Sequence, residues 1–420
     1  MLGGLVASAV VGLDTHQTLA YQAFTFLLAL VLTSIACGVL FRARLTAHRK
    51  LPKFGTAEEP LSYRILIKNK TQKRQLGLYL RENLVESRPT FEEFSGMREP
   101  GEKKRNPFDR GVGYHRWLWF LRRKQVARVD QQSIPDLPPG GEQEVHARVV
   151  PLRRGRLTLR GLEIVRTDPF GLWNSYKKIP VPQTLLVLPK RYPLPPISLP
   201  GTRKYQPGGV ALASSVGDSE EFLSLRDYRP GDPLRRIHWR SWAKMGEPIV
   251  KEYQDEFFVR HALILDTFQE TDQSELLEEA LSVAASFAYT IQTQESLLDL
   301  MFVGTEAYCF TSGRGIAHVD RILEILASVR VCTDKPFSTL PALVMERASM
   351  LSGCVCVLLS WDEERQKLIH LLNALHLPVL VLVITDDDAS QALDPGPMKS
   401  EPENLHRLQV GKIKEGLTRL

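Results

Sequence analysis

The 420-residue sequence lacks the short motifs that mark many enzymes. It has no Walker-type glycine-rich loop with its lysine, no Gly-x-Ser-x-Gly and no His-Glu-x-x-His, and its histidines fall at no zinc-binding spacing. Internal repeats are not visible either. These absences exclude the usual signatures of phosphate-binding loops, serine hydrolases and zinc proteases.

Cysteine is also scarce, with five residues in the chain. Cys37 lies in an apolar run, whereas Cys309, Cys332, Cys354 and Cys356 lie far downstream. An odd number of cysteines, with a Cys-x-Cys on an apolar strand, predicts buried reduced thiols in a cytoplasmic compartment.

The composition is that of a folded protein, with 43% hydrophobic and 24% charged residues, and the length allows two or three domains. The net charge is +6, and much of the excess follows the membrane segment or lies between Arg98 and Arg128. Such a balance indicates a membrane surface at least as readily as nucleic acid.

Charge is missing altogether from Tyr21 to Phe41. A helix of that length crosses about 30 Å of hydrocarbon, so we predict a transmembrane span at 21–41. Several basic side chains follow it: Arg42, Arg44, His48, Arg49, Lys50 and Lys53. The positive-inside rule then places the soluble bulk in the cytoplasm.

An earlier apolar run, Leu2 to Leu13, is short for a span and lacks the basic start of a signal peptide. Two interpretations remain open. The run is a short or tilted first helix that turns at residues 14–17, or the recorded start omits a few residues of a longer one. The membrane segment is assigned to residues 1–41.

From Pro60 onward the pattern favours half-buried strands in a sandwich-like domain, residues 51–190, of immunoglobulin-like shape. The strands are expected at 61–69, 76–83, 144–150, 156–166 and 183–188. We expect the sequence DPFGL (168–172) to form a hairpin turn whose Phe170 and Leu172 plug the sandwich. Trp117 and Trp119, which lie among arginines, are either ordinary strand or helix residues or contacts with a lipid interface.

A proline- and glycine-rich linker at 191–216 separates this domain from a carboxyl-terminal domain at 257–420. There, apolar strands are expected at 259–266, 297–303, 354–360 and 378–384, with helices at 274–293, 316–329, 340–350 and 363–375. This alternation predicts an α/β doubly wound sheet, mainly parallel and covered on both faces.

Residues 217–256 lie between these two domains and are rich in acids, arginines and tryptophans. The pair Asp232 and Pro233 predicts a helix start, and Gly246 predicts its end. One face of that helix would hold Leu234, Ile237, Ser241, Trp242 and Met245, and another face would hold Arg236, Arg240 and Lys244. We expect nearby acids, Glu220, Glu221 and Asp227, to neutralise the cations.

The string GDSEEFLSLRDYRPGDPLRRIHWRSWAK resembles the signature of a bacterial family of unknown function, number fifty-eight. The matching positions are Glu221, Phe222, Arg226, Tyr228, Gly231, Asp232, Arg236, Ile237 and Trp239, whereas Lys244 stands where arginine is usual. The resemblance implies a membrane hairpin, a β-rich segment and a von Willebrand factor A-like domain. It also implies association with a MoxR-type AAA+ ATPase, but no reaction.

Metal-binding A-like domains carry Asp-x-Ser-x-Ser after their first strand. Here the string is ILDTFQET, which keeps Asp266 but replaces both serines with Phe268 and Glu270. Because Mg²⁺ needs several oxygen ligands, a conventional metal site is not expected. The weak candidates are Asp266 and Asp362, together with Asp386 to Asp388. We predict no cofactor.

We therefore expect a protein-interaction or assembly factor, anchored in the bacterial plasma membrane, whose partner is a MoxR-type ATPase or another A-domain protein. Nucleic acid is not expected as a partner. One alternative is an enzyme that acts on an anionic or lipid-linked substrate at Glu221, Asp232 and His238. Another is a purely structural membrane scaffold.

Overall fold

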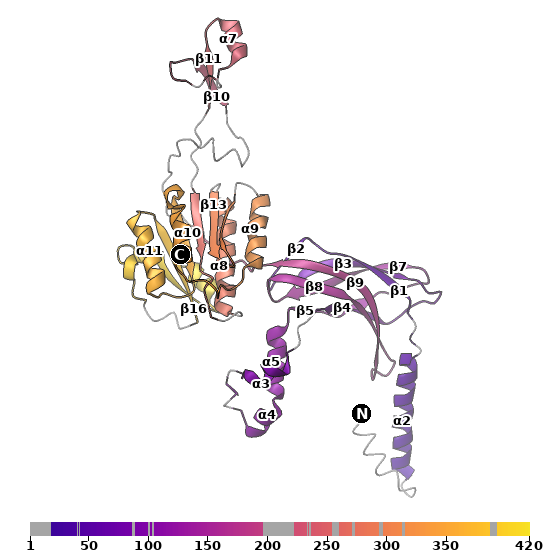
Figure 1. The fold of residues 1–420 in the computed structure, drawn as a ribbon. Coiled ribbons are helices and arrows are strands. Elements are labelled where there is room, and N and C mark those ends of the chain that lie inside the picture. The colour runs from indigo at the N-terminus through magenta and orange to yellow at the C-terminus, as the bar shows by residue number, and fades with distance from the viewer. Residues whose placement is uncertain are drawn as a thin grey trace. The chain divides into compact units, whose positions relative to one another are not determined.

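The computed structural model describes residues 18–39, 41, 43–85, 89–99, 101–102, 105–195, 222–232, 234, 237–253, 260–270, 274–293, 297–312, 316–386 and 393–420. These residues form two compact units that divide between Lys190 and Arg191. Figure 1 shows the elements of each. The short apolar run at 2–13 and the greater part of the linker expected at 191–216 lie outside the described residues.

The first unit begins with the apolar helix α2 (Thr18–Val39). Its window Gln22–Val39 has a mean hydropathy of 2.0, and only 6% of that window is buried within the protein. In the described part of the chain it is the one helix long and apolar enough to cross a membrane. Length and composition of this kind weakly indicate membrane anchoring, because signal sequences share them.

Two sheets follow and share one core, and all of their neighbouring strands pair antiparallel except β2 and β9, which are parallel. One sheet has the order β1-β3-β7-β5, and the other has the order β2-β9-β8-β4-β6. Their bounds are β1 (Leu45–Lys50), β2 (Phe54–Thr56), β3 (Leu61–Asn69), β4 (Leu78–Leu84), β5 (Ala127–Val129), β6 (Gln132–Ile134), β7 (Glu142–Pro151), β8 (Gly155–Thr167) and β9 (Asn174–Leu188). Alternation buries one face of each strand, as Tyr63, Ile65 and Ile67 do on β3.

The sandwich includes a residue that the sequence pattern had grouped with the cations after the span. Arg49 lies on β1 with its side chain fully buried, where it pairs with Glu82 of β4 at 2.6 Å. It therefore cannot face a membrane surface. Of the basic residues listed after the span, those described as exposed are Arg44, His48, Lys50 and Lys53.

A helical insertion lies between β4 and β5 and consists of α3 (Phe91–Gly96), α4 (Pro107–Val112) and α5 (Tyr114–Lys124). Thr90 and Glu93 form a capping box at the start of α3. Trp117 packs edge-on against Phe94, and Trp119 packs edge-on against Phe120. Both indoles thus have protein neighbours, and their lipid contact stays a prediction.

The turn between β8 and β9 is the expected hairpin, but its side chains do not plug the sandwich. Phe170 is 48% exposed and Leu172 is 39% exposed. Asp168, not an apolar plug, holds the turn, because its carboxylate accepts the backbone N–H groups of residues 170, 172 and 173. Burial raises the pKa of Asp168, but the N–H group of Trp173 and its other donors outweigh burial and lower it.

The second unit contains a six-stranded sheet of order β14-β13-β12-β15-β16-β17. The strands are β12 (Arg260–Leu265), β13 (Leu297–Val303), β14 (Ala307–Ser312), β15 (Gly353–Leu358), β16 (Val379–Thr385) and β17 (Leu405–Gln409). All neighbours pair in parallel except β13 and β14. The flanking helices are α8 (Glu275–Thr293), α9 (Ile316–Ser328), α10 (Thr339–Met345), α11 (Glu363–Ala374) and α12 (Ile413–Leu417).

Both faces of this sheet are covered. Ala262 and Ile264 of β12 share a core cluster with buried residues of α10 and α11, and Leu263 points to the opposite face, where α8 packs. From β12 the chain builds β13 on one side and β15 on the other, so the sheet is mixed α/β and wound in two directions. The finer prediction of a von Willebrand A-like fold is not confirmed.

All five cysteines are free thiols. Cys332, Cys354 and Cys356 are buried, as predicted, whereas Cys309 is half-buried and Cys37 is exposed on α2. The reactive form of cysteine is the thiolate, and burial raises the pKa of both Cys309 and Cys356. We therefore expect these two thiols to be less reactive than an exposed cysteine.

Candidate functional site

The signature residues form a small module in the second unit, which we call the hairpin module (residues 222–253). Strand β10 (Phe222–Asp227) pairs antiparallel with β11 (Ile249–Tyr253), and the short helix α7 (Trp239–Met245) lies between them in the chain. Figure 1 shows these three elements together. The N–H of Tyr228 donates to the carbonyl of Pro248 at 2.9 Å and extends the ladder beyond β10.

Helix α7 begins at Trp239, so the predicted start at Pro233 is wrong. Ile237 instead forms a bridge with Val250, and the N–H of His238 donates to the carbonyl of Ile249 at 2.8 Å. Pairing with β11 thus holds Ile237 extended and buried. The predicted apolar face is wrong as well, because Leu234 and Met245 are exposed. The predicted end at Gly246 is confirmed, since this glycine caps α7 with φ of 78°.

A bidentate ion pair closes the turn that follows β10. The Arg226 Nη1 and Nη2 atoms lie 2.7 and 2.8 Å from the two carboxylate oxygens of Asp232. Asp232 also accepts the N–H of Arg229 at 2.8 Å. These hydrogen bonds, led by those from Arg226, lower the pKa of Asp232 to about 2. The sequence predicted a different pairing, in which Glu220, Glu221 and Asp227 neutralise the cations of the helix, and that pairing stays a prediction because Glu220, Glu221 and Arg236 lie outside the described residues.

The lowered pKa gives the hairpin module a defined pH dependence. The pKa of an aspartate in an unfolded chain is about 3.9, so the contribution of this ion pair is full above that value and is lost as the pH falls through about 2. We expect Asp232→Asn to lose, at neutral pH, the protection of the Arg229 amide that the wild-type chain loses only in acid. Hydrogen exchange with Asp227→Asn as control measures this, and an Asp232 carboxyl that titrates near 4 would contradict it.

Within the described residues His238 contacts a hydroxyl and pairs with no carboxylate. Its Nδ1 atom lies 2.6 Å from the hydroxyl of Ser241, one turn along α7. Asp232, its proposed catalytic companion, is engaged by Arg226, and Glu221 lies outside the described residues. The enzyme alternative therefore stays a prediction without a described constellation to support it.

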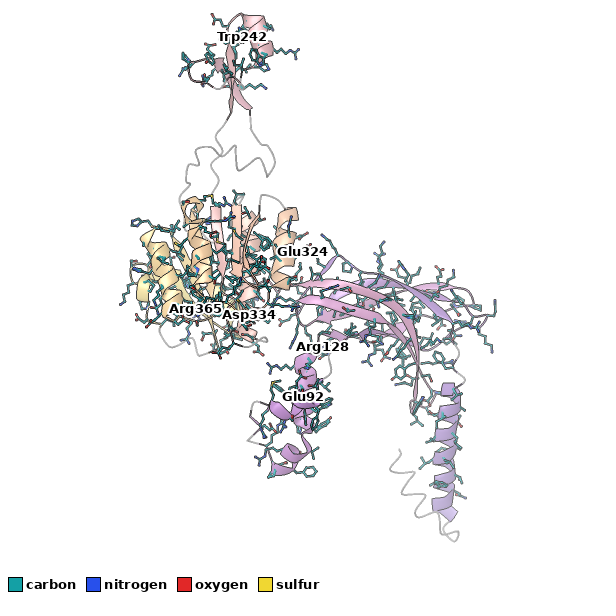
Figure 2. The ribbon with its side chains drawn as sticks, viewed as in Figure 1. Glu92, Arg128, Trp242, Glu324, Asp334 and Arg365 are labelled. Carbon is teal, nitrogen blue, oxygen red and sulfur yellow. The ribbon has the colours of Figure 1, made fainter. Side chains whose placement is uncertain are left out.

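The hairpin module exposes several apolar and basic side chains. Leu234, Trp239 and Met245 are each more than 60% exposed, and Trp239 stacks on Trp242 with ring centroids 5.3 Å apart. Figure 2 shows Trp242 on this module. Arg240 and Lys244, four residues apart on α7, are also exposed. We call these five side chains, Leu234, Trp239, Arg240, Lys244 and Met245, the α7 surface.

The remaining signature positions divide between framework and undescribed residues. Gly231 has φ of 109°, a conformation that favours glycine, and Ile237 is a core residue of the module. Phe222 is described only as backbone of β10, and Glu221 and Arg236 lie outside the described part. Tyr228 contributes its backbone N–H to the ladder.

The strand-end carboxylate Asp266 has an internal cation as its partner. Arg365 of α11 places its Nε atom 2.9 Å from Asp266 Oδ2 and its guanidinium 4.3 Å from the centroid of the Phe337 ring. The N–H groups of Phe268 and Leu359 donate to the same carboxylate. Asp266 is fully buried. Both of its carboxylate oxygens accept hydrogen bonds from these groups.

The second weak metal candidate, Asp362, belongs to the same group. It caps α11 by accepting the N–H of Arg365, and it also pairs with the Arg365 guanidinium at 2.7 Å. Burial raises the pKa of Asp362, but these hydrogen bonds outweigh it and lower the pKa. Asp386 follows the last residue of β16, and Asp387 and Asp388 lie outside the described residues. That this edge holds no conventional metal site stays a prediction, now with a physical reason in Arg365.

Sequence reasoning missed Arg365, which Figure 2 labels on α11. One available signal was its place three residues after the capping residue Asp362, in the first turn of a helix that was itself predicted. Parallel strands bring their carboxyl ends to one edge, where the first turns of the following helices also lie. A cation in such a turn can reach a strand-end carboxylate.

Comparisons with known proteins give a match to one family model over part of the chain. The model of the family described as protein of unknown function DUF58 matches residues 224–404. The chain is also 25% identical over 189 residues to the uncharacterized protein YeaD of Bacillus subtilis, a match that covers 44% of this chain and 45% of that protein. The match therefore spans less than half of the length of that relative.

Solved structures give only weak likenesses. The CARDB domain of PF1109 from Pyrococcus furiosus covers 34% of this chain and 93% of its own, at 11% identity and a TM-score of 0.18. Salmonella alpha-2-macroglobulin covers 39% of this chain and 8% of its own, at 14% identity and a TM-score of 0.18. Scores of that size assign no fold.

Proposed function

We propose that the chain is a membrane-anchored protein-interaction or assembly factor, which binds a cytoplasmic partner through the α7 surface. One observation carries this proposal: a module whose ion pair and histidine are satisfied internally leaves a tryptophan, a leucine and a methionine side chain exposed. Tryptophan and methionine are enriched in protein interfaces. The anchor in the proposal is α2, which would place the soluble bulk in the cytoplasm.

The chemistry of the α7 surface specifies the partner. Trp239 and Met245 fit an apolar pocket, and Arg240 and Lys244 favour acidic side chains around its rim. The family resemblance suggests a MoxR-type AAA+ ATPase as the protein that carries such a pocket, with another A-domain protein as the alternative. A purely structural scaffold would have no need of an exposed anchor of this kind.

Replacing Trp239 with alanine should weaken binding of the purified ATPase by about 30-fold, since truncation of a central tryptophan anchor costs at least about 2 kcal/mol. Isothermal titration of the full chain in detergent with the MoxR-type ATPase of the same host measures this. Leu371→Ala on α11, which also removes an exposed leucine side chain, is the matched control and should leave the affinity unchanged.

Because Trp239 stacks on Trp242, its loss could also disturb α7. Lys244→Glu avoids this difficulty, since the side chain is exposed and the change only reverses its charge. We expect Lys244→Glu to weaken binding of the ATPase. We also expect the affinity of this variant to depend less on ionic strength than that of the wild-type chain. If the wild-type chain does not bind the ATPase measurably, the proposed partner is wrong. If Trp239→Ala and Lys244→Glu both bind with the wild-type affinity, the α7 surface is not the binding site.

A further inference from the structure

The β8–β9 turn lies alongside the end of α2. The hydroxyl of Ser175 lies 3.4 Å from the carbonyl oxygen of Gly38, and a Cβ atom on Gly38 would stand 3.1 Å from Cδ1 of Trp173. Glycine at this position thus allows the turn to approach closely. Gly38 lies within the apolar window Gln22–Val39. The turn therefore contacts the last residues of that apolar window.

Ser34 lies one turn deeper along α2. It is 2% exposed, although almost all of the window around it is uncovered, so protein covers the helix at this depth as well. Ser34 precedes Gly38 by four residues, which is about 6 Å of helix. If α2 spans a bilayer, the turn that contacts Gly38 has to lie at the depth of its interface.

The side chains that the turn exposes suit that depth. Phe170, Leu172, Trp173 and Tyr176 are between 39% and 56% exposed, and Lys177 and Lys178 follow on β9. Aromatic rings of this kind settle at the boundary between lipid headgroups and acyl chains, and lysines next to them favour anionic headgroups. The carboxylate in the turn, Asp168, points its oxygens at backbone donors and is only 9% exposed.

The backbone of the turn also meets the requirement that a bilayer imposes. The N–H groups of Phe170, Leu172 and Trp173 donate to the Asp168 carboxylate, and that of Gly171 donates to the Asp168 carbonyl. The Asp168 N–H donates to the carbonyl of Trp173, and proline at 169 has no N–H to satisfy. From 168 to 173 every backbone donor thus has an internal acceptor, so entering a region poor in water leaves none unpaired.

We propose that the DPFGLW turn (168–173) is a second membrane contact, which inserts Phe170, Leu172 and Trp173 into the cytoplasmic headgroup region beside α2. The occupant is the lipid interface, because α2 sets the depth at which the turn lies. This inference rests on the proposed anchoring by α2. A helix alone leaves a domain free to swivel about it, whereas a helix and an inserted turn together fix which face of the sandwich looks toward the bilayer.

Fluorescence quenching by brominated lipid tests the proposal on the full chain. The protein is reconstituted in vesicles of phosphatidylcholine and phosphatidylglycerol, with bromine on the acyl carbons nearest to the headgroup. The chain has six tryptophans. We expect brominated lipid to quench the emission of Trp173, and we expect Trp173→Phe to lose that quenched component. Trp239→Phe, which removes an indole of similar exposure (63% against 56% for Trp173) on the hairpin module, is the matched control and should leave the quenched emission unchanged.

Alkaline extraction of the same vesicles separates the two proposals. If the protein stays with the lipid and quenching is equal in the wild-type chain and Trp173→Phe, the turn does not enter the interface and this inference fails alone. If alkali releases the protein, α2 is no anchor, and the proposed function fails together with the inference. Retention together with loss of quenching in Trp173→Phe alone supports both.

Discussion

Replacing Arg365 with methionine is expected to cost the α/β unit about 3–5 kcal/mol of unfolding free energy at neutral pH. The reason is that the change leaves Asp266, which is fully buried, with two backbone N–H groups and no cation. Breaking a buried ion pair from one side has a cost of this size, because an uncompensated charge stays in a medium of low dielectric constant. Methionine keeps much of the apolar volume against Phe337.

The loss should depend on pH with a defined sign. Burial raises the pKa of Asp266, and Arg365 opposes that rise. Without Arg365 the folded pKa rises further above the unfolded value of about 3.9, so the folded state keeps a proton that the unfolded chain has released. The penalty is therefore full above the folded pKa and shrinks as the pH falls toward about 3.9.

Lys367→Met on the same helix provides the control, since Lys367 is 73% exposed in a 4.0 Å pair with Glu363 and should contribute less than 1 kcal/mol. Adding Asp266→Asn to Arg365→Met removes the stranded charge and should recover most of the loss. Because the chain has two units, hydrogen exchange of the β12 and β15 amides in urea is the appropriate measurement. If Arg365→Met costs no more than Lys367→Met, the pair does not stabilise the sheet.

The α/β sheet could be predicted from the sequence because its strands are apolar throughout and its helices amphipathic. Residues 297–303 were predicted as a strand and form β13, and the strand predicted at 378–384 is displaced by one residue from β16. The edge strands β14 and β17 were missed. Edge strands bury only part of their surface, and the Tyr308 and His406 side chains remain half-exposed, so the apolar run that marks a central strand is absent.

The hairpin module was predicted less well, because its local signals compete with pairing across the chain. An aspartate before a proline is a common helix start, but the Asp232 carboxylate is used by Arg226 on β10. Ile237 sits at a helical spacing from Ser241, yet its bridge to Val250 fixes it in extended backbone. Pairing of β10 and β11 with each other and with Ile237 thus overrides the local helix signals. Such pairing cannot be predicted from neighbouring residues in the sequence.

The strand-end site shows the same limit at a longer range. The sequence identified Asp266 as the carboxylate in question and found too few oxygen ligands for a metal around it. Its actual partner stands 99 residues later in the chain. Nothing in the spacing of the two residues relates them, because it is the parallel order of β12 and β15 that brings α11 to this edge.

Arg49 repeats this situation in the sandwich and gives the second large prediction. Its guanidinium contacts both oxygens of Glu82, at 3.0 and 2.6 Å, and the Val181 carbonyl at 3.0 Å, and the Tyr63 hydroxyl donates to Glu82 at 2.6 Å. Burial raises the pKa of Glu82, and Arg49 is the first of the groups that hold it down. We expect Arg49→Met to cost the sandwich about 3–5 kcal/mol at neutral pH.

Two comparisons separate this loss from a general effect of removing an arginine. Arg64→Met removes a cation from β3, where Arg64 is 68% exposed and 3.6 Å from Glu144, and should change the stability by less than 1 kcal/mol. Glu82→Gln in the Arg49→Met background removes the stranded charge but keeps an oxygen for the Tyr63 hydroxyl, so the double variant should be the more stable of the two. Hydrogen exchange of the β3 and β4 amides measures both differences. A double variant no more stable than Arg49→Met would mean that lost packing around Arg49, and not an unpaired carboxylate, sets the cost.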